Sequence, residues 1–144
     1  MRIKPFCLLI VLASACGLAN AESAQIVKRF HLYNQTGGIA PVAIYTPRAG
    51  HGGMFRVNTF VVTTVATKYS GSFCEQLGFT TRFGDTQAYP TNGAFCASAS
   101  QVGGNIEGTI PIADEGGKPI TFSVFTNGDT SGAKYDVTII VEKF

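Results

Sequence analysis

The fold of this chain is constrained most by short runs in which polar and apolar residues alternate. Glycine pairs separate these runs. Alternation with a period of two places successive side chains on opposite faces of a β-strand. The run at residues 134–142 is the clearest, with apolar side chains at every second place: Tyr135, Val137, Ile139 and Val141. Glycine pairs at 37–38, 52–53, 103–104 and 116–117 separate the runs. No stretch after residue 21 shows a long helical period, so the pattern predicts an all-β domain.

Further runs at 26–33, 55–67, 106–112 and 120–124 define the fold class. The 55–67 run is rich in β-branched residues and apolar on both faces in its middle, which predicts a central strand or two strands joined by a bulge. About six to eight strands with turn signals between them predict an antiparallel β-sandwich, jelly-roll or immunoglobulin-like. A small barrel is the alternative.

Spacing and turn residues give more local predictions. Apolar residues at odd positions predict one strand face made of Phe73, Leu77, Phe79 and Phe83, and Ile26, Phe30 and Leu32 should share a face in the first run. The turn at 127–129 predicts an antiparallel hairpin of the last two strands. Residues 84–104, rich in Gly, Ser, Ala and Asn, are expected to form a long loop. If the terminal strand 134–144 lies at an edge, it offers a pairing surface for another chain and a route to oligomers.

The first 21 residues have the pattern of a secretory signal peptide. Arg2 and Lys4 precede an apolar stretch from residue 6 to residue 18, and Ala19-Asn20-Ala21 supplies a cleavage site. This segment is too short and wrongly flanked for a membrane span. We therefore expect a single β-sandwich domain at 22–144, secreted or periplasmic. Lipidation of Cys16 is an alternative, although Leu12 sits one place too far upstream for a lipoprotein signal.

Two cysteines, Cys74 and Cys96, remain after cleavage, and an oxidising compartment favours a disulfide between them. Their spacing matches neither a CxxC redox motif nor a zinc pattern. In the chain-entropy model, closing this loop contributes about 3 kcal/mol to stability. The disulfide would also tie the 84–104 segment back onto the strand that holds Cys74.

The charge of the domain argues against nucleic acid as a partner. Of 11 Lys and Arg residues, two lie in the predicted signal, and the remaining nine balance the nine Asp and Glu residues. The basic residues are scattered, and Lys28-Arg29 is the one adjacent pair after the signal. A neutral surface without a basic stripe does not attract a polyanion. No stable membrane span is expected either.

No sequence motif for catalysis, a metal or a cofactor is present. The chain lacks metalloprotease, nucleophile-elbow, P-loop and dinucleotide fingerprints. His31 and His51 permit a small secreted hydrolase but do not point to one. A glycosidase would need two acids from Glu75, Asp85 and Glu107 at a suitable separation. The oxygen-rich loop 127–131 has a composition that is typical of ordinary turns as well as of calcium sites. We therefore assign no catalytic residue, no metal and no cofactor.

Side chains near turns and in the predicted long loop are the candidates for binding. Aromatic residues there serve as exposed contacts at interfaces, which selects Tyr45, Tyr69, Tyr89 and Phe95, together with His51 in a glycine-rich loop. The sequence thus favours a non-catalytic binding module, adhesin-like, pilus-like or inhibitory, for an extracytoplasmic protein or glycan. A small hydrolase is the first alternative. A membrane-active β protein that uses the 59–67 run is the second.

Overall fold

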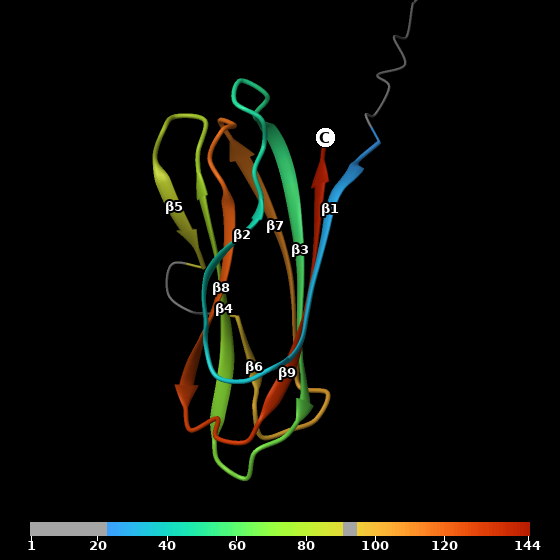
Figure 1. The fold of residues 1–144 in the computed structure, drawn as a ribbon, viewed down its shortest axis with the longest axis vertical. Coiled ribbons are helices and arrows are strands. Elements are labelled where there is room, and N and C mark those ends of the chain that lie inside the picture. Colours follow the sequence, from blue (N-terminus) through green and yellow to red (C-terminus); the bar gives the residue numbers. More distant parts are fainter. Residues whose placement is uncertain (1–22, 91–94) are drawn as a thin grey trace, which may run out of the picture.

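The computed structural model describes residues 23–90 and 95–144, which form nine β-strands in two stacked sheets (Figure 1). The first sheet has the strand order β1-β9-β3-β7, and the second has the order β2-β8-β4-β5. β6 pairs with β4 on the same edge as β5, and all pairs are antiparallel. The strands are β1 Gln25–Gln35, β2 Ile39–Tyr45, β3 Gly53–Val65, β4 Gly71–Thr80, β5 Thr86–Tyr89, β6 Cys96–Ser98, β7 Asn105–Asp114, β8 Ile120–Gly128 and β9 Lys134–Lys143.

This strand order confirms the predicted antiparallel sandwich and is that of a jelly roll. Most successive strands lie in different sheets, so the chain winds back and forth across the core. β4, β5 and β6 are the exception, because all three lie in the second sheet, where β5 and β6 both pair with β4. β1 lies beside β2 at one side of the sandwich, and β6 lies beside β7 at the other.

Alternate residues of both sheets face one another and form the core. β3 is central, between β9 and β7, as the 55–67 run predicts. Its buried face includes Thr59 and Thr63 as well as apolar residues, and the Thr63 hydroxyl donates to the Ser98 carbonyl at 2.8 Å. Tyr135 packs its ring 4.2 Å from that of Phe73, centroid to centroid. The other large, fully buried apolar side chains are Phe55, Phe122, Ile44, Leu77, Ile112, Ile120, Ile139, Val57 and Val61.

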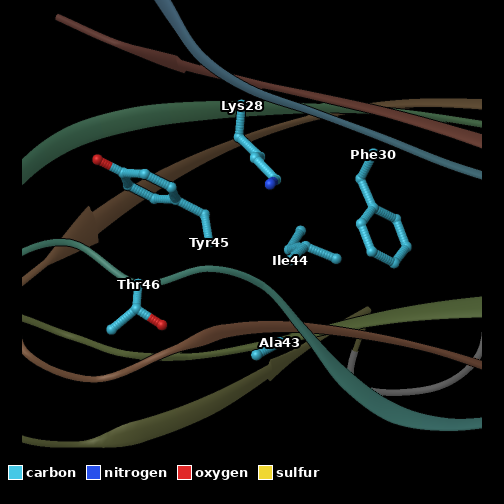
Figure 2. A pocket seen from close by; sticks show the side chains of 6 residues that line it. All are labelled: Lys28, Phe30, Ala43, Ile44, Tyr45 and Thr46. Atoms are coloured by element: carbon cyan, nitrogen blue, oxygen red, sulfur yellow. The ribbon is translucent and has the colours of Figure 1, made fainter.

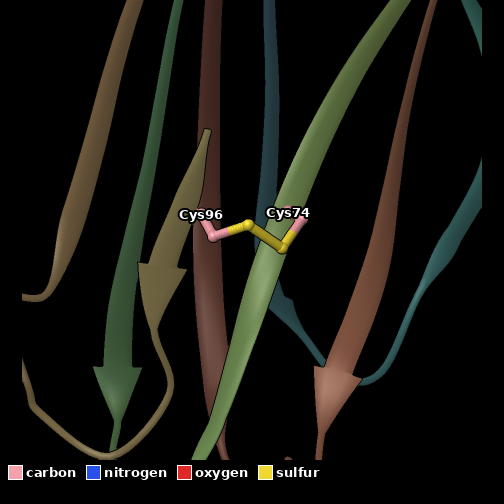
Figure 3. The surroundings of a disulfide bond; sticks show 2 residues. All are labelled: Cys74 and Cys96. Atoms are coloured by element: carbon pink, nitrogen blue, oxygen red, sulfur yellow. A yellow bond between two sulfur atoms is a disulfide. The ribbon is translucent and has the colours of Figure 1, made fainter. Parts of the chain in front are cut away.

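The predicted disulfide is confirmed: Cys74 of β4 and Cys96 of β6 are bonded and are register partners (Figure 3). Cys74 follows Phe73, which faces the core, so the disulfide lies on the outer face of the second sheet. The bridge fixes β6 to the edge of β4. A disulfide is consistent with an oxidising, extracytoplasmic environment.

Two predictions about chain connection are wrong, and the condition set for a third is not met. The last two strands do not pair as a hairpin, because β8 and β9 lie in different sheets. The terminal strand β9 is not at an edge, since it pairs with β1 and β3. The stretch 84–104 is not one long loop, because it contains β5 and β6, whose sequences are too short to show alternation.

The face assignment in β1 also needs correction. The register shifts between Ile26 and Lys28, so Val27 is a bulged residue. Ile26 pairs with Glu142 and is 43% exposed, whereas Phe30 pairs with the buried Ile139. Ile26 and Phe30 therefore do not share a face. The predicted signal peptide lies outside the described residues.

Candidate functional site: an aromatic cleft beside β5

A cleft of about 320 Å³ opens between the β4–β5 hairpin and the end of β7. The residues that line it are mostly apolar and come from β4, the β4–β5 turn, β5 and β7: Phe79, Thr81, Arg82, Phe83, Gln87, Ala88, Tyr89 and Ala113. We call this surface the β5 cleft. Concave, mostly apolar surfaces with a few polar groups are the usual form of a binding site.

The pairing of β4 with β5 directs these side chains into the cleft. Leu77 pairs with Tyr89, and Phe79 pairs with Gln87. Cross-strand partners share a face, and Leu77 is buried in the core, so Tyr89 points toward the gap between the sheets. The hairpin is held against β7 because the Arg82 amide donates to the Ala113 carbonyl at 3.2 Å.

The turn at the end of the hairpin holds an aromatic ring in solvent. The Thr81 amide donates to the Asp85 carbonyl at 2.8 Å, and the Gly84 amide donates to the Thr81 carbonyl at 2.9 Å. Gly84 has a φ of 86°, which glycine adopts without strain. Phe83 is 77% exposed as a result, with the Arg82 guanidinium 4.9 Å from its ring centroid.

The position of Phe83 corrects the sequence interpretation, which placed it on one strand face with Phe73, Leu77 and Phe79. Period-two counting fails here because Phe83 lies in the turn between β4 and β5 rather than in a strand. The pair Gly84-Asp85 is a turn signal that marks this break. Phe83 and Arg82 are therefore site residues that the sequence interpretation missed.

Of the five binding residues predicted from the sequence, the structure brings together two. Tyr89 and Phe95 have ring centroids 6.0 Å apart. His51 lies in the β2–β3 loop at the hairpin's end of the sandwich, whereas Tyr69 lies in the β3–β4 loop at the opposite end. Tyr45 ends β2, which lies at the opposite edge of the second sheet from β5. Its ring centroid lies 5.7 Å from that of Phe55.

A second, more polar cleft of about 410 Å³ adjoins the first and shares Arg82 and Ala113 with it. Asp114 and Glu115 also line it, but Asp114 is buried and accepts a 2.6 Å hydrogen bond from the Gly116 amide. A side chain at Gly52 would collide with the Asp114 carbonyl oxygen. Glycine therefore lets the loop that carries His51 pack closely against residues 114–116.

The histidines and the three candidate acids occupy separate surfaces. The His31 ring nitrogen Nδ1 lies 3.1 Å from the Thr138 hydroxyl, and Lys143 donates to the backbone carbonyl of His51. Asp85 is in the exposed hairpin turn, Glu107 faces outward on β7, and Glu75 faces the core. Within residues 23–90 and 95–144, no three His, Cys, Asp or Glu side chains gather into a possible metal site.

Glu75 is the most unusual ionisable group among the described residues. It is 1% exposed, and the Thr59 hydroxyl donates a 2.7 Å hydrogen bond to its Oε1. Its Oε2 has no hydrogen-bond partner in the described part of the chain. Burial raises the pKa of Glu75 to about 7, against the lowering effect of the Thr59 hydrogen bond.

Comparisons with known proteins assign this chain to no family. No protein-family model matches the chain, and no curated protein matches it. Among solved structures, the chain is similar to that titled "Crystal structure of infectious bursal disease virus VP2 subviral particle". The match has a TM-score of 0.43 and 13% sequence identity, and it covers 81% of this chain and 30% of that one.

Among the residues that the structure describes, none forms a helix with the length and apolar character needed to cross a bilayer.

Proposed function

We propose that this protein is a secreted or periplasmic, non-catalytic binding module that recognises a protein partner through the β5 cleft. The observation that carries the proposal is the exposed aromatic surface around that cleft. Phe83 is 77% exposed and Tyr89 is 43% exposed, although both are large apolar side chains. Complete burial of one such ring by a partner contributes about 1.5–3 kcal/mol to the free energy of binding. Aromatic and Arg side chains around a pocket are also the usual composition of interface hot spots.

The edge position of β5 supports a protein partner in particular. β5 pairs with β4 on one side, and within the described residues no strand pairs with its other side. All four of its residues are exposed. An extended segment of a partner can add to such an edge through backbone hydrogen bonds, while its alternate side chains enter the cleft.

The location proposed for this activity rests on two features. The first 21 residues have the charge, length and cleavage pattern of a secretory signal. The Cys74–Cys96 disulfide belongs in an oxidising compartment. Both support a partner that is itself extracytoplasmic.

The test is affinity capture from the extracytoplasmic fraction with the mature domain and two single variants. Phe83→Ala removes the most exposed ring of the cleft. Tyr69→Ala is the matched control, since Tyr69 is 42% exposed but lies at the opposite end of the sandwich. Each captured protein is then purified and its affinity measured. Unfolding temperatures of the variants are compared first, so that a loss of binding is not a loss of folding.

We expect one partner whose affinity falls about tenfold or more in Phe83→Ala and stays within twofold in Tyr69→Ala, since loss of a hot-spot ring costs about 2 kcal/mol. Equal losses in both variants, or none in either, would contradict a site at the β5 cleft. Binding of a glycan to the wild-type domain, with no protein captured, would replace the protein partner with a carbohydrate.

A further inference from the structure

The β-bulge at Val27 places a lysine on the inner face at the other side of the sandwich. Lys28 pairs with the buried Val141, and the next residue, Arg29, pairs with the outward-facing Ile140. Without the bulge, Lys28 would share the outward face of Ile26. Bulges commonly redirect a side chain in this way near functional sites.

Lys28 faces a cleft of about 290 Å³ between the edge strands β1 and β2. Figure 2 shows its side chain extending from β1 toward Ile44 of β2, with Phe30 on one side and Tyr45 on the other. Ala43 and Thr46 complete the lining. Ile44 is 2% exposed, so the cleft reaches the edge of the hydrophobic core.

Lys28 is exposed, and its ammonium group has no partner of opposite charge among the described residues. It makes no hydrogen bond or ion pair with any residue in 23–90 or 95–144. No Asp or Glu is among the residues that line the cleft, and Lys28 is the one charged residue among them. An unpaired cation beside apolar walls matches a ligand with one negative charge and an apolar body.

We propose that the β1–β2 cleft binds a small monocarboxylic acid with a short apolar chain. The carboxylate pairs with Lys28, and the chain lies against Phe30 and Ile44. The volume of the cleft is at the lower end of the range for small-molecule sites, which favours a short chain. This site is separate from the β5 cleft, and the inference does not depend on the proposed protein partner.

An inward-pointing charge on an edge strand has another established use. It discourages pairing with the edge of a second molecule, and β1 is a long edge strand. Edge protection requires no ligand and predicts that removal of the charge promotes self-association. The experiment must therefore measure ligand binding and self-association on the same variants.

The probes are three eight-carbon compounds that differ in the head group: octanoate, octan-1-ol and octylammonium. Binding to the mature domain is measured by calorimetry, and the contact residues are mapped from amide NMR shifts. Lys28→Met removes the charge, and Lys28→Arg keeps it. Arg29→Met is the matched control, because it removes a charge from the neighbouring residue on the opposite face. Sedimentation velocity records self-association of each variant.

We expect octanoate to bind at least tenfold more tightly than octanol or octylammonium and to shift amides at 27–30 and 43–46. Lys28→Met should weaken octanoate binding about tenfold, and Lys28→Arg and Arg29→Met should change it less than threefold. Three results would each overturn the proposal: no octanoate binding at millimolar concentration, equal binding of octanol, or shifts confined to the β5 cleft. Self-association of Lys28→Met, with no octanoate binding to the wild type, would assign Lys28 to edge protection.

Discussion

Replacement of Glu75 by glutamine should change the pH dependence of stability in a predictable direction. The native pKa of Glu75 is about 7, against an ordinary value of 4.5. At 1.36 kcal/mol per pKa unit, this difference corresponds to about 3 kcal/mol. The native state binds the proton more tightly than the unfolded chain does. Glu75 therefore favours folding most below pH 4.5, and this contribution is lost as the pH rises to 7 and stays lost above it.

Glutamine at position 75 has a similar shape and no charge. Its Oε1 can still accept the hydrogen bond from Thr59, and its amide nitrogen takes the place of Oε2, which already lacks a partner in the described part of the chain. Glu75→Gln should therefore match the wild type at pH 4.5 to within about 1 kcal/mol. At pH 8 the variant should be more stable by about 2–3 kcal/mol, because it avoids a buried carboxylate.

The assay is urea unfolding of both proteins at pH 4.5, 5.5, 6.5, 7.5 and 8.5. His31 and His51 are present in both proteins, so their contributions cancel in the difference between the two free energies of unfolding. That difference should grow between pH 4.5 and pH 7 and then level off. A difference that stays constant across this range would mean that the native pKa of Glu75 is close to its ordinary value and that burial does not raise it.

Three further substitutions test other parts of the fold by urea or thermal unfolding. Cys74→Ala with Cys96→Ala opens the disulfide and should cost about 3 kcal/mol, and an unchanged unfolding temperature would deny the bridge a structural role. Tyr135→Phe removes a hydroxyl that donates to the Gly37 carbonyl at 2.8 Å and should cost about 1 kcal/mol, whereas a stability gain would show that this bond contributes nothing. Gly108→Ala brings a methyl group 2.7 Å from the carboxyl oxygen Oε1 of Glu75 and should lower the unfolding temperature by several degrees. An unchanged unfolding temperature would show that the two sheets move apart freely at this point.

Strands with strong local patterns were predictable from the sequence. β3 and β9 carry buried faces at every second residue, and period-two alternation is sufficient to identify them. Their partners were less predictable. The turn after β8 resembles a hairpin turn, but whether the next strand stays in one sheet or crosses the core depends on packing between sheets. Turn chemistry alone does not carry that information.

The residues at the two clefts were also hard to predict from the sequence. Phe83 and Lys28 each break a period-two pattern, one because a turn begins and the other because β1 has a bulge.

The buried acid Glu75 was not predictable either. It lies in a buried row between Phe73 and Leu77, where a carboxylate is not expected. It fits because Gly108 leaves room on the opposite sheet and Thr59 supplies a donor. Such matches between distant segments are not visible in the local sequence.

Photo-crosslinking from defined positions of the mature domain tests most directly whether a protein binds at the β5 cleft. The photoreactive residue p-benzoylphenylalanine is introduced in place of Phe83 in one protein and in place of Tyr69 in another. Each is irradiated in the extracytoplasmic fraction. We expect one discrete cross-linked protein from position 83 and none from position 69. The same adduct from both positions, or an adduct from position 69 alone, would contradict a binding site at the β5 cleft.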